Sequence, residues 1–197
     1  MLVFSKARLV ILSVPKTGTT AIESALGPRA DIWVQNPPEL KHAPVFRYNR
    51  FFRPMLEKFV APDLEVIAVM REPVSWLGSW WRYRHRAELD GRANSTAGIG
   101  FDAFVDAYCR GERPSFADVG SQSKFLEPAG NGTRVTRLFR YEDQGALLDF
   151  LEQRLGTGIA LGRENVSPAM EVRLSPEVEE KYRRKCAAEF DLYASIP

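Results

Sequence analysis

Residues 7–20 read ARLVILSVPKTGTT, and this stretch predicts how the fold begins. Its apolar part, residues 7–14, is continuous rather than alternating, which is typical of a strand buried on both faces of a parallel sheet. The turn-rich PKTGTT follows, and then AIESAL, which favours a helix that ends at Gly27-Pro28. The stretch therefore predicts a strand, a tight glycine loop and a helix.

The rest of the chain continues the alternation of strands and helices. Further strands are expected at 65–70 (EVIAVM) and 134–140 (RVTRLFR), and helices at 53–60, 73–89, 101–110, 121–126, 143–155 and 175–190. This order predicts an α/β fold, a three-layer, P-loop-like domain with a central parallel sheet flanked by helices. No repeat or linker interrupts it, so residues 1–197 are expected to form a single domain.

The composition excludes several classes of protein. Of 197 residues, 45% are hydrophobic and 26% charged, and the formal net charge is +2, so no nucleic-acid partner is indicated. The two cysteines, Cys109 and Cys186, match no metal spacing and are expected to be free, buried thiols of a reducing compartment rather than a disulfide. We see no secretory signal and no run of about 20 apolar residues, so we expect a cytoplasmic protein without a membrane span.

The first loop has the chemistry of an anion site. Free N–H groups and the dipole at a helix N-terminus attract negative charge. Gly18 permits a close approach of the backbone, Lys16 adds a positive charge, and Thr17, Thr19 and Thr20 add hydroxyl donors. The lysine precedes the glycine, unlike the Walker A order G-x-x-x-x-G-K-[ST], which argues against ordinary ATPases. The plain alternative is a generic strand-to-helix turn with an exposed lysine.

A second anion site is expected where the strand 65–70 ends. Arg71 lies at the carboxyl edge of the sheet, where ligands of open α/β sheets bind. Ser79 follows about two turns into the next helix, so a guanidinium and a hydroxyl could share one phosphate. The alternative is an unrelated arginine on a helix surface. Together the two sites suit a nucleotide that carries both a 5′- and a 3′-phosphate.

These motifs resemble a known family. VPKTGTT is similar to the 5′-phosphosulfate loop, P-K-[ST]-G-[TS]-[TS], of sulfotransferases that use 3′-phosphoadenosine 5′-phosphosulfate (PAPS), and REPVSWLGS (71–79) resembles their 3′-phosphate element. FRYED (139–143) and NVS (165–167) resemble later segments of the same family. The resemblance implies sulfuryl transfer from PAPS without a required metal, with 3′-phosphoadenosine 5′-phosphate (PAP) as product. It also implies that Lys16 contacts the bridging oxygen, while Gly18, Thr19 and Thr20 hold the 5′-phosphate.

Transfer to a hydroxyl also needs a base. His42, in LKHAP, is the best candidate because imidazole titrates near neutral pH, although a surface loop histidine is the open alternative. Glu39 and Glu23 are fallback carboxylates, and Lys41 is expected to assist the sulfuryl oxygens. Gln122 is expected either near the acceptor or as a helix cap.

The acceptor is expected to be a carbohydrate or another small hydroxylated molecule, and the sequence names neither it nor the oligomeric state. The arginine-lysine-glycine clamp of the cytosolic steroid and phenol enzymes is not seen, so adenine contacts are not placed. Two other functions stay open: a P-loop-type nucleotide kinase that needs ATP and magnesium, and a non-catalytic module that binds PAP.

Overall fold

The computed structural model describes residues 1–162, 170 and 172–197, so the family-like segment 165–167 lies outside the described residues. The chain folds into two compact units. The first comprises Met1–Arg71, Gln122–Asn165 and Ile196–Pro197, and the second comprises Glu72–Ser121 and Val166–Ser195. The first unit carries the sheet, and the second is helical.

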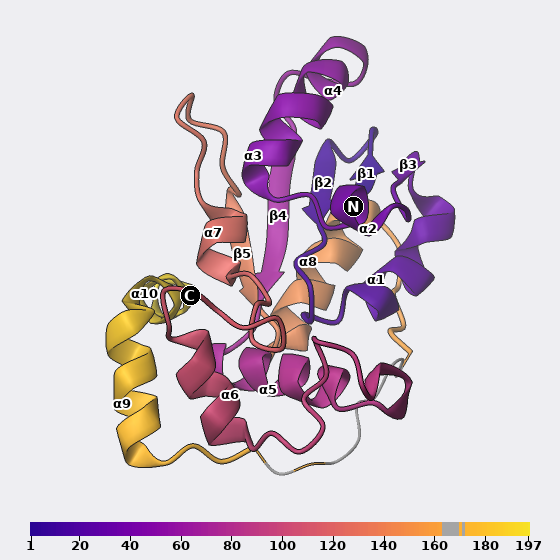
Figure 1. The fold of residues 1–197 in the computed structure, drawn as a ribbon. Helices are drawn as coiled ribbons and strands as arrows, with labels where there is room; N and C mark the ends of the chain where they lie inside the picture. Colours follow the sequence, from indigo (N-terminus) through magenta and orange to yellow (C-terminus); the bar gives the residue numbers. More distant parts are fainter. Residues whose placement is uncertain (163–169, 171) are drawn as a thin grey trace. The chain divides into compact units, whose positions relative to one another are not determined.

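A five-stranded sheet in the order β3-β1-β2-β4-β5 forms the first unit (Figure 1). Its strands are β1 (Leu2–Phe4), β2 (Leu9–Leu12), β3 (Ile32–Trp33), β4 (Glu65–Met70) and β5 (Arg137–Arg140). β2, β4 and β5 are parallel, as predicted, and β4 has the predicted bounds. The α/β class is therefore confirmed.

The expectation of a wholly parallel sheet is wrong, because β1 runs antiparallel to both of its neighbours. A tight turn explains this direction. The Arg8 N–H donates to the Ser5 carbonyl at 3.1 Å, and Arg8 has a positive φ of 48°, so the chain reverses and β2 pairs with β1 as a hairpin. The apolar run that follows Arg8 is thus an inner strand of a mixed sheet.

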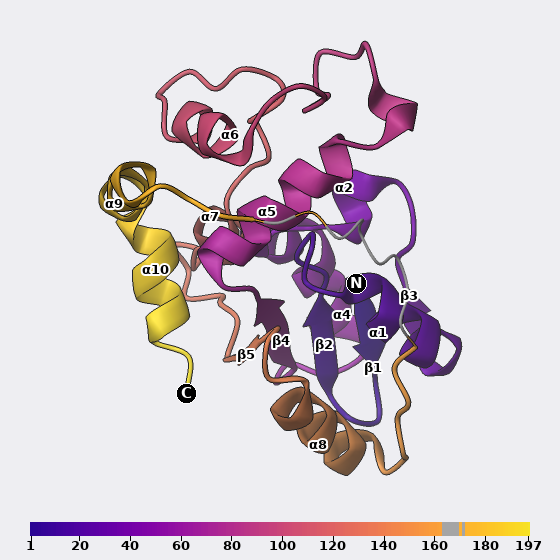
Figure 2. The same ribbon diagram turned by 90° about the horizontal axis from the view of Figure 1, so that it is seen from below.

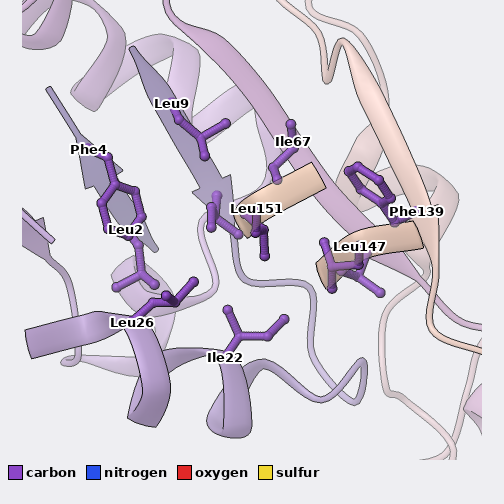
Figure 3. Close-up of a cluster of buried hydrophobic side chains, with 11 residues drawn as sticks. Leu2, Phe4, Leu9, Ile22, Leu26, Ile67, Phe139, Leu147 and Leu151 are labelled. Atoms are coloured by element: carbon purple, nitrogen blue, oxygen red, sulfur yellow. The ribbon is translucent and has the colours of Figure 1, made fainter. Parts of the chain in front are cut away.

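Helices α1 (Thr19–Leu26) and α8 (Gln144–Leu155) contribute to a hydrophobic cluster on one face of the sheet. Figure 3 shows Ile22 and Leu26 of α1 and Leu147 and Leu151 of α8 among side chains from the strands. Alternate residues of β2, such as Val10 and Leu12, point to the opposite face and are equally buried. Burial on both faces accounts for the unbroken apolar run of this strand.

Between β3 and β4 the chain is more helical than predicted. The short helix α2 (Pro38–Lys41) is followed by α3 (Val45–Arg47), a π-helical turn η2 (Tyr48–Phe52) and α4 (Arg53–Phe59). Only the last of these was expected. The unit also contains a 3-10 turn η1 (Gly27–Arg29) and α7 (Gln122–Leu126).

The second unit packs helices around an aromatic core. It contains α5 (Pro73–Arg84), a 3-10 turn η3 (Ala87–Leu89), α6 (Phe101–Tyr108), α9 (Pro176–Lys185) and α10 (Ala187–Ala194). Trp76, Phe104 and Tyr182 are fully buried in its core. The single helix expected over 175–190 is wrong: Cys186 has a non-helical conformation, and the chain changes direction there (Figures 1 and 2).

The two cysteines, distant in sequence, meet in the second unit. Cys109 and Cys186 are free and half-buried, and their thiols lie close enough to influence each other. The interaction lowers the pKa of Cys109 and, together with burial, raises that of Cys186. The expectation of free thiols is confirmed, but they are only partly buried.

Candidate functional site

Each of the three parallel strands delivers a side chain to the carboxyl edge of the sheet. Lys16 follows β2, Arg71 follows β4 and Tyr141 follows β5. The Arg71 guanidinium donates to the Lys16 carbonyl at 3.4 Å and lies 4.4 Å from the centre of the Tyr141 ring. Gly18 faces the same ring, because a Cβ added at this glycine would lie 3.0 Å from it. The first loop and Arg71 are therefore neighbours, as predicted.

The backbone of the first loop contains two left-handed residues. Lys16 has a φ of 66° and Gly18 a φ of 73°, whereas Thr17 between them has a negative φ. Left-handed residues occur in loops whose main-chain N–H groups turn together toward an anion. A lysine in the left-handed region costs roughly 1 kcal/mol, and such strain is concentrated at functional sites.

The N-terminus of α1 leaves donors open. Gly18 is its N-cap, and no side chain caps it. The Gly18 carbonyl accepts from Ala21 and Ile22 inside the helix. In the described part of the chain, no acceptor pairs with the main-chain N–H groups of Gly18, Thr19 and Thr20. These groups and the helix dipole form the positive end of the site.

The three threonines of the loop differ in exposure. Thr17 is 1% exposed, and its hydroxyl donates to the Val14 carbonyl at 2.9 Å, so this hydroxyl holds the loop instead of facing a ligand. Thr19 is also buried, whereas Thr20 is half-buried. The Thr17 hydroxyl is therefore engaged within the loop, and the hydroxyls of Thr19 and Thr20 remain the predicted donors.

Gln122 fixes the end of β4. Its side-chain amide donates to the Arg71 carbonyl at 2.8 Å and accepts from the Arg71 N–H at 2.9 Å. The Gln122 residue is fully buried. Because the residue is fully buried and both ends of its amide bond the Arg71 main chain, Gln122 positions Arg71, and its side chain does not suit a contact with the acceptor, one of the two alternatives given by the sequence.

A buried carboxylate of α1 is hydrogen-bonded to the residues that precede the first loop. Glu23 of α1 is 4% exposed, and its oxygens receive the Ser13 hydroxyl at 2.9 Å and the Lys41 ammonium at 2.7 Å. The amino group of Met1 donates to the same hydroxyl at 2.9 Å. Glu23 is therefore engaged on both oxygens and does not suit the fallback role of base, and Lys41 is paired with it. The other fallback, Glu39, is exposed.

His42 is bound where β2 ends. Its Nδ1 lies 2.7 Å from the Ser13 carbonyl, three residues before Lys16. A carbonyl only accepts, so Nδ1 carries the proton, and Nε2 of the neutral ring is left as the basic nitrogen. Burial lowers the pKa of His42 below its ordinary value of 6.5. The ring is therefore neutral at pH 7, and Nε2 has no hydrogen-bond partner among the described residues.

Ser79, which the sequence pairs with Arg71, lies on α5 of the second unit and is 7% exposed. The described residues contain no group of three or more His, Cys, Asp or Glu side chains that could hold a metal ion.

Two residues of the site escaped the sequence analysis. Tyr141 was read only as part of a family-like strand end, although the edge rule that selected Arg71 applies equally to the residue after β5. Ser13 carries no motif, and only the fold shows that it joins His42 and Glu23. Comparison of the chain with protein-family models, curated proteins and solved structures finds no match. A function must therefore be inferred from these residues.

Proposed function

We propose that this protein is a sulfotransferase that moves the sulfuryl group of PAPS to an acceptor hydroxyl. One observation carries the proposal: the open N–H groups at Gly18, Thr19 and Thr20 lie on the same loop as Lys16, next to Arg71. A phosphosulfate group needs such a combination of main-chain donors and fixed cations. A neutral histidine is held where this loop begins.

The donor would be bound through its two phosphate-bearing ends. The 5′-phosphosulfate would occupy the helix N-terminus, where Gly18 permits close approach. Arg71 would bind the 3′-phosphate, and Gln122 and the Tyr141 ring support its position. Ser79, on the second unit, is assigned to the 3′-phosphate only because of the sequence resemblance.

The proposed transfer is a direct displacement at sulfur. The acceptor oxygen forms a new bond to sulfur while the bond between sulfur and the bridging phosphate oxygen breaks. The acceptor proton passes to Nε2 of His42, and PAP leaves with the negative charge on its 5′-phosphate. Lys16 and the open N–H groups stabilise that charge, so positioning and electrostatics supply most of the catalysis.

The first test is calorimetric binding of PAP, adenosine 5′-monophosphate and ATP, with and without magnesium. We expect magnesium-independent binding of PAP at least tenfold tighter than that of the monophosphate, because a second phosphate adds charge-assisted hydrogen bonds. Equal affinities would remove the 3′-phosphate assignment. Magnesium-dependent ATP binding that ignores the 3′-phosphate would favour a nucleotide kinase instead.

Turnover is the second test. Purified protein is incubated with radiolabelled PAPS and a panel of sugars, phenols and amines, and sulfated products are separated by chromatography. Product that requires His42 supports the transferase. Tight PAP binding without product over the whole panel would instead point to a PAP-binding module.

A further inference from the structure

The segment Val45–Phe59 carries an unusual exposed surface on the first unit. Large hydrophobic side chains that are exposed in the described chain all lie within it: Phe46 (57%), Phe51 (58%), Met55 (39%) and Phe59 (73%). We call these four residues the aromatic stripe. A soluble surface normally exposes single apolar residues, and a concentration of this kind marks an interaction site.

The stripe follows one side of a helical run because of the π-helical turn. Phe51, Met55 and Phe59 are spaced four residues apart, which places them on one face of α4 and its approach. Phe46 precedes Phe51 by five residues, and the turn between them has the wider i→i+5 bond from Arg53 N–H to the Tyr48 carbonyl. Because a wider turn rotates less per residue than an α-helix, we infer that five residues leave Phe46 nearer the line of the other three than an unbroken α-helix would.

The opposite side of the segment is firmly held. Tyr48 is 2% exposed and Leu56 is fully buried. Arg53 bonds Glu57 at 2.6 Å and Asn49 at 3.2 Å, and it also donates to Thr133. The stripe is therefore the outer face of an anchored helix. In Figure 1, α4 lies beside the end of β4 at which that strand begins.

Cations accompany the rings of the stripe. Arg47 lies over Phe46, Arg50 over Phe51 and Lys58 over Phe59, with charge-to-ring-centre distances of 5.3–5.4 Å. The one carboxylate of the segment, Glu57, is paired with Arg53. The outer face thus combines apolar rings with positive charge and has no acidic residue of its own to balance it.

This combination fits an anionic lipid surface better than a protein groove. Helices that lie in the plane of a membrane bury rings at the boundary of headgroups and acyl chains, while Lys and Arg contact lipid phosphates. Protein interfaces share the enrichment in Phe, Met and Arg but deplete lysine from their centres, so Lys58 over the most exposed ring, Phe59, favours the lipid surface. A cavity of about 270 Å³ borders the segment, but Tyr48, Arg53 and Glu57 line it, and none of the stripe residues does. No helix among the described residues is long and apolar enough to cross a bilayer.

We propose that Val45–Phe59 docks on the surface of an anionic bilayer, with the aromatic stripe inserted at the interface and Arg47, Arg50 and Lys58 on lipid phosphates. The inference does not depend on the sulfotransferase proposal, since the segment contains none of the residues assigned to donor binding or to the base.

The test is flotation of the full chain with vesicles of phosphatidylcholine alone or mixed with phosphatidylglycerol. We expect binding only to the mixed vesicles, weakened by added salt. Phe51→Ser with Phe59→Ser should lower the partition coefficient at least tenfold. Arg50→Glu with Lys58→Glu should lower it at least 25-fold, because removing each cation alone costs about fivefold.

The matched control is Lys6→Glu with Arg92→Glu, which makes the same change of net charge at exposed positions outside the segment. It should keep most of the binding. Circular dichroism and PAP affinity, measured on every variant, separate loss of docking from loss of fold or of the donor site. Absence of binding to the mixed vesicles, or binding that the segment variants leave unchanged, would overturn the proposal. A second outcome would also overturn it. If the parent protein self-associates, the Phe variants abolish that self-association, and neither the parent nor any variant binds vesicles, the stripe is a contact between two copies of the chain.

Discussion

Two strand-to-helix junctions of the first unit are built differently, although both follow parallel strands. After β5, Asp143 caps α8, and its side chain accepts from the Ala146 N–H at 3.1 Å. After β2, a glycine stands at the same position before α1, and no side chain replaces the missing acceptor. One helix end is satisfied within the protein, whereas the other keeps its donors open.

Under the proposed function, the difference separates a junction that binds a ligand from one that only stabilises the fold. A side-chain cap is worth roughly 1 kcal/mol, and the left-handed lysine costs a similar amount. The junction at α8 keeps that stability. The junction at α1 forgoes it, and we infer that a bound anion restores it. Variants at the two junctions should therefore have different effects. Those at α1 should change ligand binding and turnover, whereas those at α8 should change stability alone.

The largest expected effect is on Lys16. Lys16→Ala should lower sulfuryl transfer from PAPS by roughly 10³-fold, because the charge on the departing phosphate loses its fixed cation. Rates are measured with radiolabelled PAPS and the best acceptor of the panel. Lys6→Ala, at the exposed tip of the hairpin, is the control and should leave the rate unchanged. Normal turnover by Lys16→Ala would show that the open junction is not the reacting site.

His42, the proposed base, lies beside the open junction. Burial lowers its pKa below 6.5, so the neutral, basic form persists to lower pH, and kcat/KM should fall only below pH 6.5 as the ring becomes protonated. His42→Gln should lower the rate by about 10²-fold and remove this acidic limb of the pH profile. A limb that survives in His42→Gln would assign the base to another group.

Gly18 tests the space beside the open donors. Gly18→Ala places a methyl group 3.0 Å from the Tyr141 ring, at a φ of 73° that alanine disfavours. We expect about tenfold weaker PAP binding by calorimetry and a loss of roughly 1 kcal/mol in the free energy of unfolding. If Gly18→Ala binds PAP as the parent does, close approach at this glycine is not needed.

The smallest effect is expected at the capped junction. Asp143→Ala should lower the free energy of unfolding by about 1 kcal/mol, because the Ala146 N–H loses its acceptor. Asp143→Asn is the conservative partner and should keep most of the stability, and both variants should bind PAP as the parent does. Denaturant titration and calorimetry measure the two quantities. A large drop in PAP affinity would contradict the contrast between the junctions.

The sequence predicts the parallel part of the fold well and its antiparallel part poorly. EVIAVM is long, apolar and bounded by Arg71, so β4 could be predicted to the residue. β1 and β3 have three and two residues, too few for a pattern to emerge, and they exist because they pair. The π-helical turn in Tyr48–Phe52 and the break at Cys186 likewise depend on packing, which local propensity does not contain.

The site divides in the same way. Lys16, Gly18 and Arg71 could be placed because the carboxyl edge of a parallel sheet collects them. The pairing of Glu23 with Lys41 and the hydrogen bond from His42 to Ser13 join segments of unrelated sequence, so only the folded chain reveals them. The structure thereby removes Glu23 from the candidate bases, because both of its oxygens are engaged, while His42 and Glu39 remain predictions.

The two hydrogen bonds between Gln122 and the main chain of Arg71 also hold together the two ends of the segment 72–121, so a segment inserted between them does not have to separate them. The chain leaves the first unit after Arg71 and returns to it at Gln122. These two residues are hydrogen-bonded to each other. The fifty residues 72–121 therefore connect two residues, Arg71 and Gln122, that are in contact within the first unit. Chains that share this sheet could exchange such an excursion for a longer or shorter one without moving β4, as domain insertions between adjacent ends do.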